Sequence, residues 1–192
     1  NTVRFNGSSV ASLTYSGSGS WNMTDTNATS TGSVRVTSGG LTLPSGSLAV
    51  GGSFIKSAGT VTHNTSDIIM TATSTALFTA SSSDMYAVRF AGPAAFTITD
   101  TSITFLDSFT IASGSVLMAT GTTAVGGSFT ATGGTFNHSS GTVLMNASAS
   151  GKTIDPGTSA FYNLQIGAPS GGYTLYSATT TNNFTIASVN IL

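Results

Sequence analysis

The 192-residue chain contains no cysteine and no glutamate, and only 6% of its residues are charged. Without cysteine it can form neither disulfide bonds nor thiolate metal sites. An average globular protein is about 25% charged, so this chain has too few charged side chains to cover the exposed faces of helices. A formal net charge of −1 provides no basic surface for nucleic acid or an anionic membrane. We therefore expect no helical fold and no nucleic-acid partner.

Long apolar segments are also missing from the sequence. No run approaches the roughly 18 apolar residues of a membrane-spanning helix, so we expect no membrane span. The sequence shows no secretory signal and begins at Asn1, which predicts a mature or partial piece of a protein. An extracellular location at the cell surface is thus expected from composition alone.

Serine and threonine make up about a third of the chain, and 39% of residues are hydrophobic. Disordered chains are poor in apolar residues, so this hydrophobic content indicates an ordered protein. Valine, isoleucine, phenylalanine and leucine occur in short alternating runs, which is typical of strands with one buried face. The composition predicts an all-β fold whose exposed surface carries hydroxyl groups rather than charges.

The chain repeats itself at a fixed offset. The segment Ala49–Phe54 returns as Ala124–Phe129, and Phe109–Ser113 returns as Phe184–Ser188. The same 75-residue offset relates His63 to His138. A fixed period in sequence is typical of stacked units that share one continuous core.

We divide the single repetitive domain, residues 1–192, into a partial repeat 1–32, full repeats 33–107 and 108–182, and a partial repeat 183–192. One repeat contains about four strand–turn segments, each of roughly 19 residues, the length of one coil of a β-solenoid. The sequence thus predicts a β-solenoid with about four coils in each repeat. The same spacing also fits pairs of short strands, so a β-sandwich filament subunit is the alternative.

The first copy of the repeat contains additional residues between Gly7 and Ser33, including Trp21. Insertions in repeat proteins map to loops on one face, which is often the binding face. Trp21 therefore has two interpretations: a cap on the N-terminal end of the core, which we favour, or a ligand-binding side chain.

Several motifs follow one another in a fixed order: Gly126-Gly127-Ser128-Phe129, Gly134-Thr135-Phe136, Gly141-Thr142-Val143-Leu144-Met145-Asn146, Lys152-Thr153-Ile154, Phe161-Tyr162-Asn163-Leu164-Gln165-Ile166 and Phe184-Thr185-Ile186-Ala187-Ser188. This pattern resembles the repeats of large bacterial adhesin-like, or filamentous-haemagglutinin-like, β-solenoid surface proteins. The resemblance implies an extracellular, elongated, multi-repeat protein and transfers no catalytic residue. The Gly7–Ser33 insertion and the scarcity of Asn and Asp in the turns depart from the pattern.

The sequence offers few residues for chemistry. His63 and His138 occupy one phase of the repeat, and a repeated position indicates a turn or solvated histidine rather than a catalytic or metal-binding one. Asp100 and Asp107 could approach each other as the carboxylate pair of a glycoside hydrolase, but no basic residue lies near them in sequence. We therefore expect no enzyme activity, no catalytic, cofactor-binding or metal site, and no cofactor.

Two further patterns concern the strands. Four Thr-x-Thr triplets, at residues 60–62, 71–73, 97–99 and 130–132, would suit an ice-binding face only if they aligned on successive coils, and the 75-residue offset does not align them. The aromatic residues recur with the repeat and predict stacked core ladders rather than a sugar-binding strip: Phe54, Tyr86, Phe90, Phe109, Phe129, Tyr162 and Phe184. Tyr173 and Tyr176 are candidates for contact with a partner.

These patterns together predict a structural or adhesive protein of a surface fibre, sheath or layer. Its partners would be further copies of the chain, joined through exposed strand edges, and surface glycans. The alternative is a carbohydrate- or ice-binding module that uses a face rich in Ser and Thr.

Overall fold

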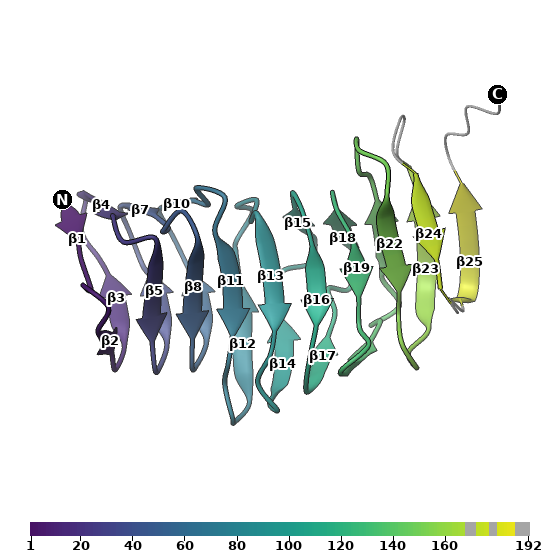
Figure 1. Cartoon of the computed structure of the whole chain (residues 1–192), viewed down its shortest axis with the longest axis horizontal. Coiled ribbons are helices and arrows are strands. Elements are labelled where there is room, and N and C mark those ends of the chain that lie inside the picture. Colours follow the sequence, from purple (N-terminus) through teal and green to yellow (C-terminus); the bar gives the residue numbers. More distant parts are fainter. Residues whose placement is uncertain (168–171, 177–179, 187–192) are drawn as a thin grey trace.

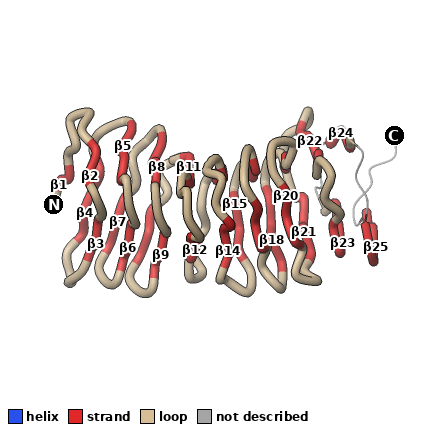
Figure 2. Tube along the Cα trace, turned by 90° about the horizontal axis from the view of Figure 1, so that it is seen from below, coloured by secondary structure: helices blue, strands red, loops and turns tan. Residues whose placement is uncertain are grey.

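The computed structural model describes residues 1–167, 172–176 and 180–186. Within these residues the chain forms 25 short strands and no helix. The strands stand side by side across a rod, with β1 at one end and β25 at the other (Figure 1). The view from below shows the same succession of coils, linked by short turns (Figure 2).

A nine-stranded sheet runs along the whole rod, and we call it the first face. Its strands, in order, are β2 (Ser9–Val10), β5 (Asn27–Ser30), β8 (Ser47–Val50), β11 (Asp67–Met70), β13 (Ala87–Phe90), β16 (Phe109–Ile111), β19 (Phe129–Thr130), β22 (Lys152–Asp155) and β24 (Tyr173–Leu175). At the usual strand spacing of about 4.8 Å, nine strands extend for roughly 40 Å.

A seven-stranded sheet forms the second face. It contains β3 (Leu13–Tyr15), β6 (Val34–Val36), β9 (Phe54–Lys56), β12 (Ala76–Thr79), β14 (Ala95–Ile98), β17 (Ser115–Leu117) and β20 (Thr135–Asn137).

Two shorter sheets follow one another along the third face. The four-stranded sheet contains β1 (Thr2–Val3), β4 (Ser20–Met23), β7 (Gly40–Thr42) and β10 (Thr60–Thr62). The five-stranded sheet contains β15 (Ile103–Phe105), β18 (Thr122–Val125), β21 (Thr142–Met145), β23 (Phe161–Ile166) and β25 (Thr180–Ile186). Met85 bridges to Phe105 at the start of this second sheet, so the third face is interrupted between β10 and β15.

Every strand pair recorded in the described residues is parallel. Sandwich hairpins would give antiparallel pairs, so the structure confirms the β-solenoid and not the sandwich. Thr2 pairs with Asn22, and Thr42 pairs with Thr62, at the same separation along the chain. One coil is therefore about 20 residues long, at the short end of the range for solenoid repeats, and it normally contains three strands.

The two copies of the 75-residue repeat lie on different faces. Phe54 lies in β9 on the second face, whereas its copy Phe129 lies in β19 on the first. The repeat is thus not a whole number of coils long, which differs from the expected four segments of one coil each. The duplicated segments consist of a strand followed by a turn. Each such segment spans one face and one corner of the coil, so it can occupy any of the three faces. Ala187 and Ser188, which end the second copy, lie outside the described residues.

The stretch between Gly7 and Ser33, expected to be an inserted loop, forms regular coils instead. It contains β2, β3, β4 and β5, and Thr29 in β5 pairs with Ser9 in β2 at the usual separation of one coil. Its sequence differs from the later repeat, but it keeps the alternation of buried and exposed residues. The backbone register of the solenoid is therefore maintained here without the repeat motif.

Ladders of apolar side chains fill the interior of the coils. Phe109 and Phe129 stack with ring centroids 5.0 Å apart, and Phe54 and Phe78 stack at 5.4 Å. Further ring contacts extend this aromatic core along the rod through Phe90, Phe96, Phe105, Phe136 and Phe161. The predicted core ladder is confirmed for Phe54, Phe90, Phe109 and Phe129, but not for Phe184, which is 48% exposed.

The two copies of one aromatic position provide a matched test of the core. Replacing the fully buried Phe109 by alanine should lower the free energy of unfolding by about 3–5 kcal/mol, because it leaves a cavity beside the stacked ring of Phe129. The same change at the exposed copy, Phe184→Ala, should cost well under half as much. Thermal and urea unfolding followed by circular dichroism would measure both, and equal losses would contradict the assignment of the core.

Candidate functional site

The Gly-Gly-Ser-Phe motif forms a tight corner in both copies of the repeat. A Cβ atom at Gly51 would collide with the carbonyl oxygen of Thr31 in the preceding coil, and one at Gly126 with that of Leu106. The corner brings the backbones of successive coils so close that only glycine fits. The phenylalanine that ends the motif turns into the core. The motif is therefore explained by packing alone.

The serine of the same motif replaces a backbone hydrogen bond. Ser53 Oγ accepts from the Leu77 N–H at 2.9 Å, and its copy Ser128 accepts from the Thr153 N–H at 3.0 Å. In both places the next coil is longer than usual, because Phe54 pairs with Phe78 and Phe129 with Ile154. In the longer coil this N–H group lies away from the backbone acceptor of the sheet, and the serine hydroxyl accepts its hydrogen bond instead.

The two histidines hold equivalent turns. His63 Nδ1 accepts from the Thr65 N–H, and His138 Nδ1 accepts from the Ser140 N–H, both at 3.1 Å. The two residues after each histidine have positive φ, and the backbone bond closes three residues on, as in a type I′ turn. The structure thus places both histidines in turns, as their repetition predicts. The described residues contain no cluster of three or more potential metal ligands.

Each histidine ring also packs against the ring of a tyrosine of the next coil. The ring centroids are 6.0 Å apart for His63 and Tyr86, and 5.3 Å apart for His138 and Tyr162. Both tyrosines are only partly buried, so they stabilise the turns instead of joining the core ladder that their recurrence predicted.

The structure gives Asp100 and Asp107 separate partners. Asp100 accepts from the N–H groups of Ala80 and Ser81, at 2.8 and 2.6 Å. Asp107 lies 3.4 Å from Lys152 Nζ. One carboxylate follows β14 and the other follows β15, so they lie at different corners of a coil. Their contacts are those of structural side chains and do not form a carboxylate pair.

Asp107 belongs to a charged group beside the first face that also contains Asp67, Arg89 and Lys152. Burial raises the pKa of Asp67; Arg89 opposes this rise, and the Asp107 carboxylate adds to it. The Lys152–Asp107 pair is about a third exposed, and such pairs contribute roughly 0–1 kcal/mol. Four of the chain's few charges therefore lie together with no net charge.

The four Thr-x-Thr triplets do not form one array. The triplet at 60–62 is strand β10 on the third face, 71–73 lies in the turn after β11, 97–99 begins in β14 on the second face, and 130–132 begins in β19 on the first. This confirms that the triplets are not aligned on successive coils.

Trp21 lies at the N-terminal end of its core column. Trp21 pairs in register with Leu41 on one side. On its other side Asn1 donates from its amino group to the Ser20 carbonyl oxygen at 2.7 Å and accepts from the Asn22 N–H at 2.8 Å, so the polar Asn1 lies beside Trp21. The indole packs against the core and lies 5.7 Å from the ring of Tyr15. Burial raises the pKa of Tyr15 to about 12. These contacts fit the cap, which is the favoured interpretation of Trp21.

The two tyrosines proposed for partner contact differ in environment. Tyr173 is half-buried, and its hydroxyl oxygen accepts from the Ala147 N–H at 2.6 Å. Tyr176 is 52% exposed in the last described coil. Only Tyr176 therefore remains available to a partner.

Sequence reasoning missed the interruption of the third face. The turn there contains Ser81 and Ser82, with φ of +44° and +66°. Buried Lys56 donates from Nζ to the carbonyl oxygen of Ser81 at 2.9 Å, and the Ser81 hydroxyl donates to the carbonyl oxygen of Lys56 at 2.7 Å. The polar run Ser81-Ser82-Ser83-Asp84 is the sequence signal for this turn, but it does not stand out among the many polar turns of the chain.

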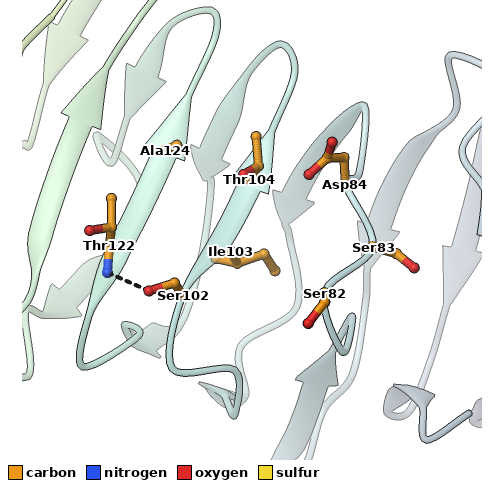
Figure 3. A pocket seen from close by; sticks show the side chains of 8 residues that line it. All are labelled: Ser82, Ser83, Asp84, Ser102, Ile103, Thr104, Thr122 and Ala124. Carbon is orange, nitrogen blue, oxygen red and sulfur yellow. Dashed lines mark hydrogen bonds between the residues drawn. The ribbon is translucent and has the colours of Figure 1, made fainter.

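A hollow of about 230 Å³ opens beside this turn. Figure 3 shows Asp84 on the turn facing Thr104 on β15, with Ala124 on the neighbouring strand β18. It is a surface depression that combines hydroxyl groups, one carboxylate and two apolar side chains.

Comparisons with protein-family models, with curated proteins and with solved structures found no match. In the part of the chain that the structure describes, no helix is long and apolar enough to cross a membrane.

The turn of His138 allows a test of backbone strain. Ser140 has φ of +59° and an exposed side chain, and a left-handed conformation costs a non-glycine residue roughly 1–2 kcal/mol. Glycine removes this strain, but its extra freedom in the unfolded chain offsets part of the gain in stability. Ser140→Gly should therefore stabilise the protein by about 0.5–1 kcal/mol. Urea unfolding would measure this gain. Ser140→Ala keeps the Cβ atom and should give none; a similar gain there would contradict the strain.

The raised pKa of Asp67 predicts a dependence of stability on pH. An acid whose pKa is higher in the folded than in the unfolded state binds its proton more tightly when folded, so it destabilises the folded state at neutral pH. Asp67→Asn should therefore raise the free energy of unfolding at neutral pH, and the difference should shrink as the pH falls toward the ordinary value of 3.8.

Urea unfolding at a series of pH values would test this prediction, with the exposed Asp84→Asn as control. A loss of stability in Asp67→Asn at neutral pH would show that attraction to Arg89 outweighs burial.

Proposed function

We propose that this chain is a structural or adhesive segment of an extracellular surface fibre, sheath or layer. The observation that carries the proposal is the unbroken aromatic and aliphatic core that joins successive coils. Such a core grows by adding coils, so length and stiffness are the properties that this architecture supplies. The weakly charged, hydroxyl-rich surface supports it further, because little of that surface changes charge with pH. The resemblance to adhesin-like surface repeats points the same way.

The last described coil supports association through its end. Four apolar side chains of this coil are 43–52% exposed: Leu175, Tyr176, Phe184 and Ile186. Phe184 and Ile186 are copies of Phe109 and Ile111, which are fully buried because β19 and the residue that follows it pack over them. A further coil from a second copy of the chain would bury these two side chains in the same way and pair with β25, the last strand of its sheet in the described residues.

Electron microscopy at neutral pH and moderate salt, with analytical ultracentrifugation, tests this function. We expect filaments with a regular axial repeat, or concentration-dependent association. Replacing Phe184 and Ile186 together by serine should abolish association, because the end of the core would then be polar. Leu117→Ser is the control, since Leu117 is 41% exposed on the second face. A monodisperse monomer at high concentration, or equal effects of both changes, would contradict the proposal.

A carbohydrate-binding module is the second candidate function, and the hollow beside the Ser81–Asp84 turn is the observation that favours it.

A further inference from the structure

The hollow at the interruption of the third face has an apolar floor and a polar rim. Ile103 and Ala124 supply the apolar surface, and Ser82, Asp84 and Thr104 stand around it, whereas the Ser83 side chain points away (Figure 3). It forms where the regular sheet is absent between β10 and β15, so the turn stands beside β15 without being part of a full strand.

The turn that forms one wall of the hollow is held by hydrogen bonds to its backbone. Ala80 and Ser81 donate their N–H groups to Asp100, and Lys56 donates to the carbonyl oxygen of Ser81. The Ser83 N–H closes the turn on the carbonyl oxygen of Ala80 at 3.1 Å. The wall is thus formed before a ligand arrives, which reduces the entropy cost of binding.

The rim offers hydrogen-bonding groups that the protein does not use. The hydrogen bonds recorded for the described residues include none from the hydroxyls of Ser82, Ser83 or Thr104, and none to the Asp84 carboxylate. Ser102 differs, because its hydroxyl accepts from the Thr122 N–H at 3.0 Å. Two hydroxyls of the rim, those of Ser82 and Thr104, can therefore both donate and accept, and they lie beside the Asp84 carboxylate, which only accepts.

The chemistry of this rim selects a class of ligand. Its one charge is negative and no basic side chain lines it, so an anion is disfavoured. A calcium ion takes six to eight oxygen ligands, and the rim provides a single carboxylate. A neutral ring with several hydroxyl groups and an apolar C–H face matches both the rim and the floor. At about 230 Å³ the hollow is smaller than the roughly 300–1,000 Å³ of common ligand sites, so it suits one ring.

We propose that the hollow formed by the Ser81–Asp84 turn, β15 and β18 binds one neutral sugar ring, with Asp84 and Thr104 bonding its hydroxyl groups. This site goes beyond the structural role, since a rod needs no ligand. It also gives the surface fibre a means of contacting glycans.

Saturation-transfer NMR with glucose, galactose, mannose and N-acetylglucosamine at millimolar concentration tests the site on the whole chain. We expect at least one sugar to receive saturation from the protein. Asp84→Asn and Thr104→Val should each weaken its binding by about tenfold, the change expected from one lost hydrogen bond of this strength. Ala124→Leu should block binding by filling the hollow.

Thr97→Val is the matched control, because Thr97 is an outward threonine on the second face, away from the hollow. Circular dichroism would verify that each variant is folded, and Thr104→Val keeps the shape of the side chain it replaces. Binding unchanged in Thr97→Val and weakened in the other variants would support the site. No transfer to any of the four sugars, or binding that all variants retain, would overturn it. Filament formation does not enter this measurement, so its failure would leave the structural proposal standing.

Discussion

The structure depends on one constraint: each coil must place its inward side chains directly over those of the coil before it. Parallel backbone pairing fixes this register, and a shift by one residue would turn every buried side chain outward. The column Phe54–Phe78 shows that the register survives even where a coil is longer than its neighbours. The additional residues are absorbed at a corner, where Ser53 supplies the missing acceptor.

The scarcity of charge follows from the same constraint. Identical positions of neighbouring coils lie about 4.8 Å apart, so a charge repeated on every coil would form a column of like charges. Hydroxyl groups avoid this repulsion because they both donate and accept. Thr79 and Thr99, whose side-chain oxygens lie 2.6 Å apart on successive coils, show the favourable alternative. Where charges gather, as in the group of Asp67, Arg89, Asp107 and Lys152, the two signs balance.

Much of the fold could be predicted from the sequence, because alternation and repetition are both local signals. The buried face of β16 follows directly from Phe109 and Ile111, which alternate with Thr110. The number of strands in a coil could not be predicted, since a corner within a coil and a turn between coils have the same Gly and Ser composition. The prediction of an inserted loop between Gly7 and Ser33 was wrong for a related reason. The coils there lack the repeat motif but keep the alternation of buried and exposed residues.

The candidate site was harder to predict. Lys56 shares the inward face of its strand with Phe54, yet its partner Ser81 belongs to the next coil, and no local pattern connects them. The histidine turns were predictable because they occur twice. The hollow beside Ser82 occurs once and depends on an interruption of the sheet, so only the three-dimensional arrangement reveals it.

The mismatch between the repeat and the coil gives the molecule a screw symmetry. Each copy of the repeat advances along the rod and also rotates about its axis, so that His63 lies beside the third face and His138 beside the second. Duplication of this unit spreads any surface feature around the circumference instead of aligning it along one side. A rod built this way presents the same feature on more than one face, so contacts made through that feature need not lie along one side.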